Sequence, residues 1–429
     1  MPNWADSMQQ TFEFYVVDPG TWKDTKRLDT VKSCTITRDL DTDTLGSATF
    51  DITESVGECY IRVYLITIQN GVREKHALGT FLVQTPATSF DGKVRSVSMD
   101  AYTPLIELKE NSPEIGYSIP KTVYYMVAKQ GDGSYDKYVT DAGEYVTTDV
   151  NITATPLLDE QGNQIKTPVG EPVYSYETDA GIRAYYCFSE TVMDIAYRIV
   201  LDKARAPKVR TECNTPVYSN FIADPNDTWF SFLNDLISSA NYSFELDEMG
   251  RILFAQGVEF AKMQPVWTYT DDNSSILYPD IDIDHDIFGI PNVVEVTYSN
   301  GAQFRVENND PHSPVSIPNR GREIIYRTSD TDLVGTPRSE DDPITEIYAI
   351  NLLHQLSSVE YTLKYTHAYC PVRLGDCVRL NYSRAGLNNV KAKVIYQSIK
   401  CEPGCPVTET AAYTVDLWKK EVVKDGKTE

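Results

Sequence analysis

Ser33-Cys34-Thr35-Ile36-Thr37-Arg38, followed by Ser47-Ala48-Thr49-Phe50-Asp51-Ile52-Thr53, begins the stretch from Ser33 to Leu108 that decides the fold. Apolar and polar residues alternate in both segments, which places one set of side chains in a core and the other in water, as in half-buried strands. A third strand pattern, Tyr60–Ile68, leads into Asn70-Gly71, a pair that tolerates the positive φ angles of a tight hairpin. With further strands expected at 78–83 and 94–99, this β-unit predicts a small closed or nearly closed barrel.

The composition describes a folded chain of several domains. At ~150 residues per domain, 429 residues predict two to four domains. A hydrophobic content of 41%, with 28 Tyr and 14 Phe, is typical of a folded protein rich in β-structure. No stretch approaches the ~18 apolar residues of a membrane span, and the N-terminus lacks the pattern of a signal peptide. We therefore expect a protein made in the cytosol and not exported by the general secretory route.

The chain is acidic throughout. Its 62 Asp and Glu outnumber its 39 Lys and Arg, which gives a net charge of −23 spread over the whole length. Phosphate binding needs clustered basic side chains, so this balance argues against a surface that binds nucleic acid. Solubility alone is a sufficient reason for such acidity.

The eight cysteines are expected to be free thiols. Cys401 and Cys405 form the only close pair, and no second pair or histidine lies near them in the sequence to complete a metal site. Nucleophilic catalysis would need a Cys or Ser beside a His, and only His367 with Cys370 are close in sequence. No GxSxG or HExxH motif and no Gly-rich phosphate loop occurs. We predict structural roles for both residues, no enzymatic activity and no cofactor.

Periodicity divides the chain into four segments. Residues 1–110 form the first β-barrel domain, and 111–183 a β-rich insertion with many Gly and Pro. Residues 184–262 read as an α+β module in which Ser189 caps one helix, Asp227 begins a second, and a hairpin follows. Residues 263–429 are a second β-barrel domain with one helix over 343–357, started by Asp342-Pro343. The predicted fold class is mainly β, with two β-barrels bracketing the α+β module.

Alternating aspartates give the sharpest local pattern in the sequence. On a strand, Asp280, Asp282, Asp284 and Asp286 share one face, with successive carboxylates ~6.5–7 Å apart. Carboxylates in this arrangement suit a calcium site, the acidic lining of a channel, or a solvated polar face. No metal is predicted, because the solvated face is the simplest of the three.

Arg320 and Arg322 stand out in an otherwise acidic chain. Arginine suits bidentate contacts at interfaces, so the pair is a candidate for contact with a neighbouring acidic subunit. The alternative is an intrachain partner for one of the many carboxylates. The sequence does not separate the two.

Several short motifs follow one another along the chain: Thr35-Ile36-Thr37-Arg38-Asp39, Gly46-Ser47-Ala48-Thr49-Phe50-Asp51-Ile52, Leu78-Gly79-Thr80-Phe81-Leu82-Val83 with Asp91-Gly92, Asp100-Ala101-Tyr102-Thr103-Pro104-Leu105, Asp227-Thr228-Trp229, Asp247-Glu248-Met249-Gly250-Arg251, Ile290-Pro291-Asn292-Val293-Val294 and Leu374-Gly375-Asp376-Cys377-Val378. In this order they resemble the hub proteins of bacteriophage tails and related injection machines. That family includes the N-terminal half of VgrG-type spike proteins and the N-terminal hub domains of tail-associated lysins. The resemblance covers nearly the whole chain except residues 117–180.

The resemblance implies a homotrimer in which each chain supplies two related barrels. Six barrels would form a pseudo-hexameric ring around a lumen and join the six-fold tail tube to the three-fold tip. It also implies neighbours in the virion: a tail tube or distal tail protein ring, the terminus of a tape measure protein, and a spike, fibre or lytic tip protein. Assembly would take place in the host cytoplasm.

In such a ring the negative charge of the chain would have a function. Duplex DNA carries one negative charge per ~1.7 Å, so an acidic channel repels it where a basic one would retain it. We therefore expect part of the negative charge, including the aspartates of 280–286, to line the channel.

Two other functions stay open: a tail-associated peptidoglycan hydrolase or peptidase, and a receptor- or glycan-binding adhesin that uses the tyrosines and the insertion.

Overall fold

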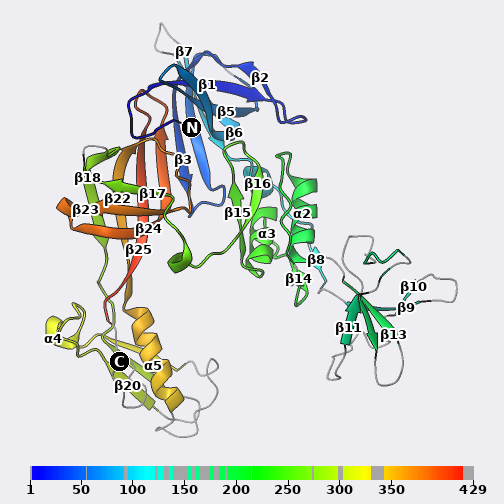
Figure 1. Cartoon of the computed structure of the whole chain (residues 1–429), viewed down its shortest axis with the longest axis vertical. Coiled ribbons are helices and arrows are strands. Elements are labelled where there is room, and N and C mark those ends of the chain that lie inside the picture. Colours follow the sequence, from blue (N-terminus) through cyan, green and yellow to red (C-terminus); the bar gives the residue numbers. More distant parts are fainter. Residues whose placement is uncertain are drawn as a thin grey trace. The chain divides into compact units, whose positions relative to one another are not determined.

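The computed structural model describes residues 2–418 except 55, 91–94, 121–123, 130–134, 139–152, 157, 159–160, 165–173, 178–182, 189–190, 214, 273–274, 298–302 and 330–342 (Figure 1). The chain divides into two compact units. Unit 1 comprises Met1–Ser7, Arg38–Leu40 and Phe260–Glu429, and unit 2 comprises Met8–Thr37 and Asp41–Glu259. The Asp91-Gly92 pair of the third motif and the predicted helix caps Ser189 and Asp342 lie outside the described residues.

Antiparallel sheets dominate the part of the chain that the structure describes, and its helices are few and short. The mainly β fold class is thereby confirmed. Within the described ranges, no helix has the length and apolar character needed to cross a membrane.

The sheet of unit 2 follows the strand patterns of the sequence. Its strand order is β3-β4-β7-β6-β5-β1-β2. Asn70 and Gly71, with φ of 53° and 79°, form the tight turn that was predicted between the third and fourth strand patterns. The strands are β1 (Gln9–Val17), β2 (Asp24–Arg27), β3 (Val31–Asp39), β4 (Gly46–Ile52), β5 (Tyr60–Gln69), β6 (Val72–Phe90) and β7 (Arg95–Tyr102).

This sheet is rolled. β1 and β4 are four positions apart in the strand order, which in a flat sheet separates them by roughly 19 Å, four times the ~4.8 Å strand spacing. The ring centroids of Phe14 in β1 and Phe50 in β4 are nevertheless only 6.2 Å apart, and Phe50 also meets Phe81 at 6.5 Å. The inward side chains therefore meet across an enclosed core, as the barrel prediction requires.

The α+β module of unit 2 is built on two capped helices, α2 (Val192–Lys203) and α3 (Trp229–Ser238), after the short helix α1 (Ile106–Lys109). Thr191 and Thr228 are the N-caps, and each forms a capping box, with Asp194 and Ser231 respectively. The apolar side chains of both helices are buried in one core. The hairpin β15 (Tyr242–Leu246) and β16 (Ile252–Gln256) completes the module, with the short pair β8 (Ser118–Ile119) and β14 (Phe221–Ile222).

The insertion begins later than the predicted residue 111. Tyr117 packs against Trp229 and Phe232, with ring centroids 4.9 and 5.6 Å apart, and Ile119 is buried in the same core. Residues up to 119 thus belong to the α+β module because their side chains complete its core.

A five-stranded antiparallel sheet of order β10-β9-β13-β12-β11 follows: β9 (Tyr124–Lys129), β10 (Tyr135–Tyr138), β11 (Thr153–Pro156), β12 (Tyr174–Glu177) and β13 (Arg183–Phe188).

Unit 1 contains a second rolled sheet of order β18-β22-β25-β24-β23-β17. Tyr269 in β17 and Tyr365 in β22 are again four positions apart, yet their ring centroids are separated by 5.2 Å. The strands are β17 (Trp267–Thr270), β18 (Leu277–His285), β22 (Ser358–Ala368), β23 (Cys377–Tyr382), β24 (Leu387–Lys400) and β25 (Pro406–Asp416).

The helix predicted for the second barrel packs elsewhere in unit 1. α5 (Pro343–Leu356) covers a separate sheet of order β20-β19-β21, made of β19 (Val293–Thr297), β20 (Gln303–Glu307) and β21 (Ile325–Thr328). Val294, Val306 and Leu353 share their buried core. Residues 263–429 are therefore a rolled sheet plus a small α+β subdomain, which also holds the short helix α4 (Ile317–Arg320), and not a single barrel.

The two rolled sheets have the same connectivity. We number the strands of each sheet from first to sixth along the chain and leave out the short β2. From one edge to the other, both sheets then have the order first, fourth, fifth, sixth, third, second. Each also has a register shift in its fifth strand opposite the sixth, between Val83 and Thr85 in β6 and between Val394 and Tyr396 in β24. They differ at the first strand, since β1 is antiparallel to β5 whereas β17 is parallel to β23.

Candidate functional site

The predicted aspartates lie on the end strand of the rolled sheet in unit 1. Asp282 is opposite Lys364 and Asp284 opposite Thr362, whereas Ile283 is opposite the buried Leu363. Asp282 and Asp284 therefore share the outward face of β18. Asp280 and Asp286 are exposed as well, and Asp286 follows the strand, where its carboxylate accepts the Phe288 N–H at 2.7 Å. Within the described ranges, no three Asp, Glu, His or Cys side chains are grouped to hold a metal.

Arg320 and Arg322 point to different surroundings. Arg320, at the end of α4, donates to the carbonyl oxygens of Ile290 (3.0 Å) and Ile287 (2.6 Å). Burial, and then the neighbouring charge of Arg322, lowers the pKa of Arg320. Arg322 is exposed. The partners of Arg320 are thus backbone carbonyls of its own chain, and Arg322 is the member of the pair that faces solvent.

A buried polar network that the sequence analysis missed lies inside the rolled sheet of unit 1. Glu409 in β25 is 0% exposed. It accepts hydrogen bonds from the Tyr365 hydroxyl (2.5 Å), the Tyr269 hydroxyl (3.3 Å) and the Gln397 amide (2.6 Å). His367 Nε2 lies 3.4 Å from its second oxygen. Three strands, β17, β22 and β24, are thereby bonded to the carboxylate of a fourth, β25.

The electrostatics of this network favour the ion pair. Burial alone would raise the pKa of Glu409, but the hydrogen bond and charge of His367 and the hydroxyl of Tyr365 outweigh it, so the pKa is lowered. Burial likewise opposes protonation of His367, yet Cys370 and Glu409 raise the pKa of His367 to about 10. A buried carboxylate and imidazolium that satisfy each other's charge stabilise the charged forms of both.

His367 and Cys370 are close in space but sealed in the core. Cys370 Sγ is 3.9 Å from His367 Nδ1 and 3.5 Å from the Tyr269 hydroxyl. Cys370 and His367 are 1% and 0% exposed. A hydrolase needs a nucleophile that its substrate can reach, so this geometry favours structural roles for both residues.

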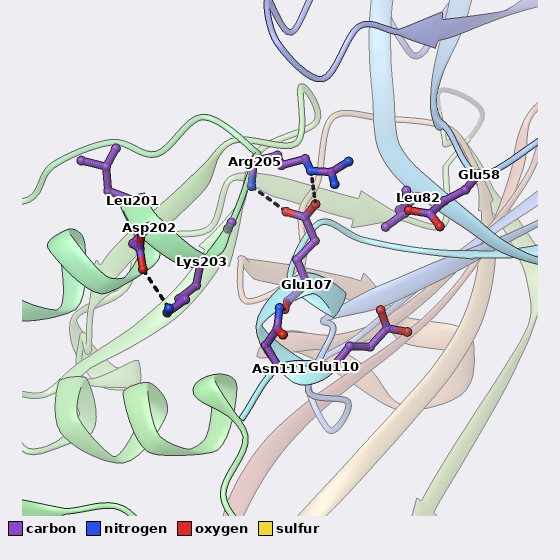
Figure 2. Close-up of a pocket in the computed structure, with 10 residues that line it drawn as sticks. Glu58, Leu82, Glu107, Glu110, Asn111, Leu201, Asp202, Lys203 and Arg205 are labelled. Atoms are coloured by element: carbon purple, nitrogen blue, oxygen red, sulfur yellow. Dashed lines mark hydrogen bonds and ion pairs between the residues drawn. The ribbon is translucent and has the colours of Figure 1, made fainter. Parts of the chain in front are cut away.

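A cavity of about 480 Å³ lies in unit 2 where the rolled sheet meets the α+β module (Figure 2). Glu107 of α1 occupies its centre: its carboxylate accepts the Tyr60 hydroxyl of β5 and, at 2.7 Å, the backbone N–H of Arg205 after α2. Burial, and then the bond to Glu107, raises the pKa of Tyr60. Because the oxygens of Glu107 are used to join two parts of unit 2, this carboxylate acts as a structural connector.

A second connector in unit 2 is the fully buried Arg62 of β5. Its guanidinium donates to Asp24 Oδ1 (2.8 Å), to Thr80 Oγ1 (2.9 Å) and to the carbonyl of Met249 (3.2 Å) in the β15–β16 turn. Trp22 Nε1 donates to the same carbonyl at 2.8 Å. The turn of the α+β module is thereby fixed to the rolled sheet.

Weak signals for the buried charges Arg62 and Glu409 exist in the sequence. Arg62 is the one charged residue in the apolar run Tyr60–Ile68, and Glu409 occupies an inward position of its strand, two residues from Val407 and from Ala411. A charge at an inward position predicts a buried partner. The partners themselves are not predictable, since Met249 is 187 residues from Arg62 and Tyr269 is 140 residues from Glu409.

No protein-family model matches this sequence, and no curated protein matches it. The structure is similar to that of the tail protein from Neisseria meningitidis MC58, with a TM-score of 0.51, 11% identity, and coverage of 94% of this chain and 97% of that one. It is also similar to the 43 kDa tail protein of prophage MuSo2 from Shewanella oneidensis, with a TM-score of 0.50, 9% identity, and coverage of 95% and 98%. At this identity the likeness establishes a shared fold that extends over nearly the whole of each chain.

Proposed function

We propose that this chain, which has the fold of two tail proteins, is a structural hub at the distal end of a bacteriophage tail. Three copies form a pseudo-hexameric ring that joins the six-fold tail tube to the three-fold tip. The ring is part of the virion and is assembled in the host cytoplasm. Its neighbours are a tail tube or distal tail ring, the terminus of a tape measure protein, and a spike, fibre or lytic tip protein.

The observation that carries this proposal is the repeated connectivity of the two rolled sheets. Both sheets share the same strand order and the same register shift in the fifth strand. A chain with two related sheets supplies six similar building blocks in three copies, which is how a three-fold assembly meets a six-fold one.

The charge distribution supports a channel that lets DNA pass. The chain carries a net charge of −23, and the exposed Asp280, Asp282, Asp284 and Asp286 add carboxylates to one strand of unit 1. In the proposed ring these side chains line the channel and repel the phosphates. The site binds no cofactor and no metal in this proposal.

The proposed role is not catalytic. Cys370 and His367 lie in the core, and Glu107 is bonded to Tyr60 and Arg205. Both arrangements support parts of the fold.

The mass of the purified chain in solution, measured by light scattering after size-exclusion chromatography, tests the proposal. We expect a trimer of the 48.3 kDa chain that persists on dilution. A stable monomer or dimer at the concentrations of assembly would contradict it.

A further inference from the structure

In unit 1, the register shift of the fifth strand, β24, binds a further segment of the same unit, Arg38–Leu40. Ile395 lies at the register shift between Val394 and Tyr396, and its carbonyl accepts the N–H of Leu40 at 3.0 Å. Two residues further along β24, the Gln397 side chain accepts a hydrogen bond from Arg38 at 3.0 Å. The shift thus presents a carbonyl to the residue that follows β3, because a bulge leaves one backbone group out of the ladder.

Unit 2 has the matching position at Gln84, between Val83 and Thr85 of β6. Gln84 is partly exposed, and its side chain donates to Glu110 at 2.7 Å. Glu110 and Leu82 both line the cavity of Figure 2, so open space lies beside this position. The fifth strand of unit 2 therefore has the local geometry that accepts a segment in unit 1.

The matching segment is the end of β18. In chain order β18 is the second strand of its sheet, as β3 is of the other, so His285 and Asp286 correspond to Asp39 and Leu40. Asp284, His285 and Asp286 are all exposed.

We infer that the end of β18 of one copy adds to the Gln84 position of a second copy, with the Asp286 N–H donating to the Gln84 carbonyl. The inference rests on the proposed ring and names the contact that closes it. The contact is heterologous, since it joins two different surfaces, and repetition of such a contact closes a ring when the rotation allows it. The proposed contact joins a fifth-strand shift to the residue after a second strand, as the bond between Leu40 and Ile395 does within unit 1.

Co-expression of two differently tagged variants that each carry one added cysteine, Gln84→Cys and Asp286→Cys, tests the contact. Both positions are partly or fully exposed, so neither change disturbs a core. After mild oxidation, we expect a covalent two-chain species that carries both tags as the main cross-linked product, and neither variant alone forms it. Wild type controls for the native thiols, and Lys400→Cys, at an exposed position of β24, replaces Asp286→Cys in the matched control pair.

The outcomes separate the contact from the proposed function. If the wild type is a trimer but the mixed pair gives no more product than the Lys400→Cys control, the contact is overturned and the hub proposal stands. If either variant alone cross-links to itself, the interface is isologous and the inference is wrong. If the wild type does not oligomerise, both proposals fail.

Discussion

At the scale of single residues, two buried charges organise the fold. Arg62 ties the rolled sheet of unit 2 to the turn at Met249, and Glu409 ties four strands of unit 1 together. A buried ion pair contributes little against an apolar replacement of both partners, but the loss of one partner leaves the other without compensation. The two sites therefore make strong predictions for single substitutions.

Arg62→Leu destabilises the protein by about 3 kcal/mol, because Asp24 and the Met249 carbonyl lose a donor that is 1% exposed. The measurement is urea unfolding followed by circular dichroism. Arg73→Leu is the matched control: Arg73 pairs with Glu13 but is 54% exposed, so its loss changes stability by less than about 1 kcal/mol. Equal effects of the two changes would refute the role assigned to Arg62.

The His367–Glu409 pair predicts a pH dependence. Because the folded pKa of His367, about 10, lies above its ordinary 6.5, its contribution is fully present below pH 6.5 and is lost as the pH rises through about 10. The pKa of Glu409 is lowered, so the contribution of this carboxylate is present at neutral pH and is lost only in acid. His367→Gln should flatten the fall in melting temperature between about pH 7 and 10.

The control for this pH series is His312→Gln, which changes an exposed ring outside the core. We expect this variant to keep the alkaline fall of the wild type. An unchanged slope in His367→Gln would mean that other groups cause the alkaline loss of stability.

At the scale of elements, the sequence predicts what local pattern determines. The alternation in 33–53, the Asn70-Gly71 turn and the two helices of the α+β module all appear as expected, because each depends on neighbours within a few residues. Local pattern does not determine where the insertion begins or which sheet α5 covers. Both depend on packing with distant residues, Tyr117 on Trp229 and Leu353 on Val294, which periodicity does not record.

In the candidate site, too, local pattern predicts some features, whereas others depend on distant residues. The shared face of Asp282 and Asp284 follows from strand alternation and is seen in the structure. The carbonyl partners of Arg320 lie 30 and 33 residues away in a loop, where no periodic pattern exists to predict them.

The turn of the β15–β16 hairpin gives a prediction at this scale. Gly250 has φ +74°, and a Cβ there would lie 2.8 Å from Thr80 Cβ, whereas Gly71 has φ +79° and open space around it. Gly71→Ala should cost about 1–2 kcal/mol for the left-handed backbone alone. Gly250→Ala should cost about 1–3 kcal/mol more, because the turn must move from the sheet.

Urea unfolding of both glycine variants measures this difference. If Gly250→Ala is no less stable than Gly71→Ala, the turn does not pack on β6 as the structure has it.

At the scale of the whole molecule, the acidic surface predicts that the wild-type protein does not bind duplex DNA. In the assembled protein, Asp282→Lys with Asp284→Lys should create binding of duplex DNA that weakens steeply with salt, since these side chains line the proposed channel. Fluorescence anisotropy with labelled duplex measures it. The matched control reverses two other exposed carboxylates, Glu54→Lys with Glu402→Lys. Equal binding by both double variants would show that net charge, and not a lining, decides the interaction.

The central claim is that each chain carries two equivalent rolled sheets and that three chains place six of them in one ring. Single-particle electron microscopy of the purified assembly, viewed along its symmetry axis, tests it most directly. The account predicts a closed ring with three-fold symmetry, six similar lobes around the lumen, and an open centre. A particle with three lobes, or one in which the second sheet of each chain lies outside the ring, would contradict it.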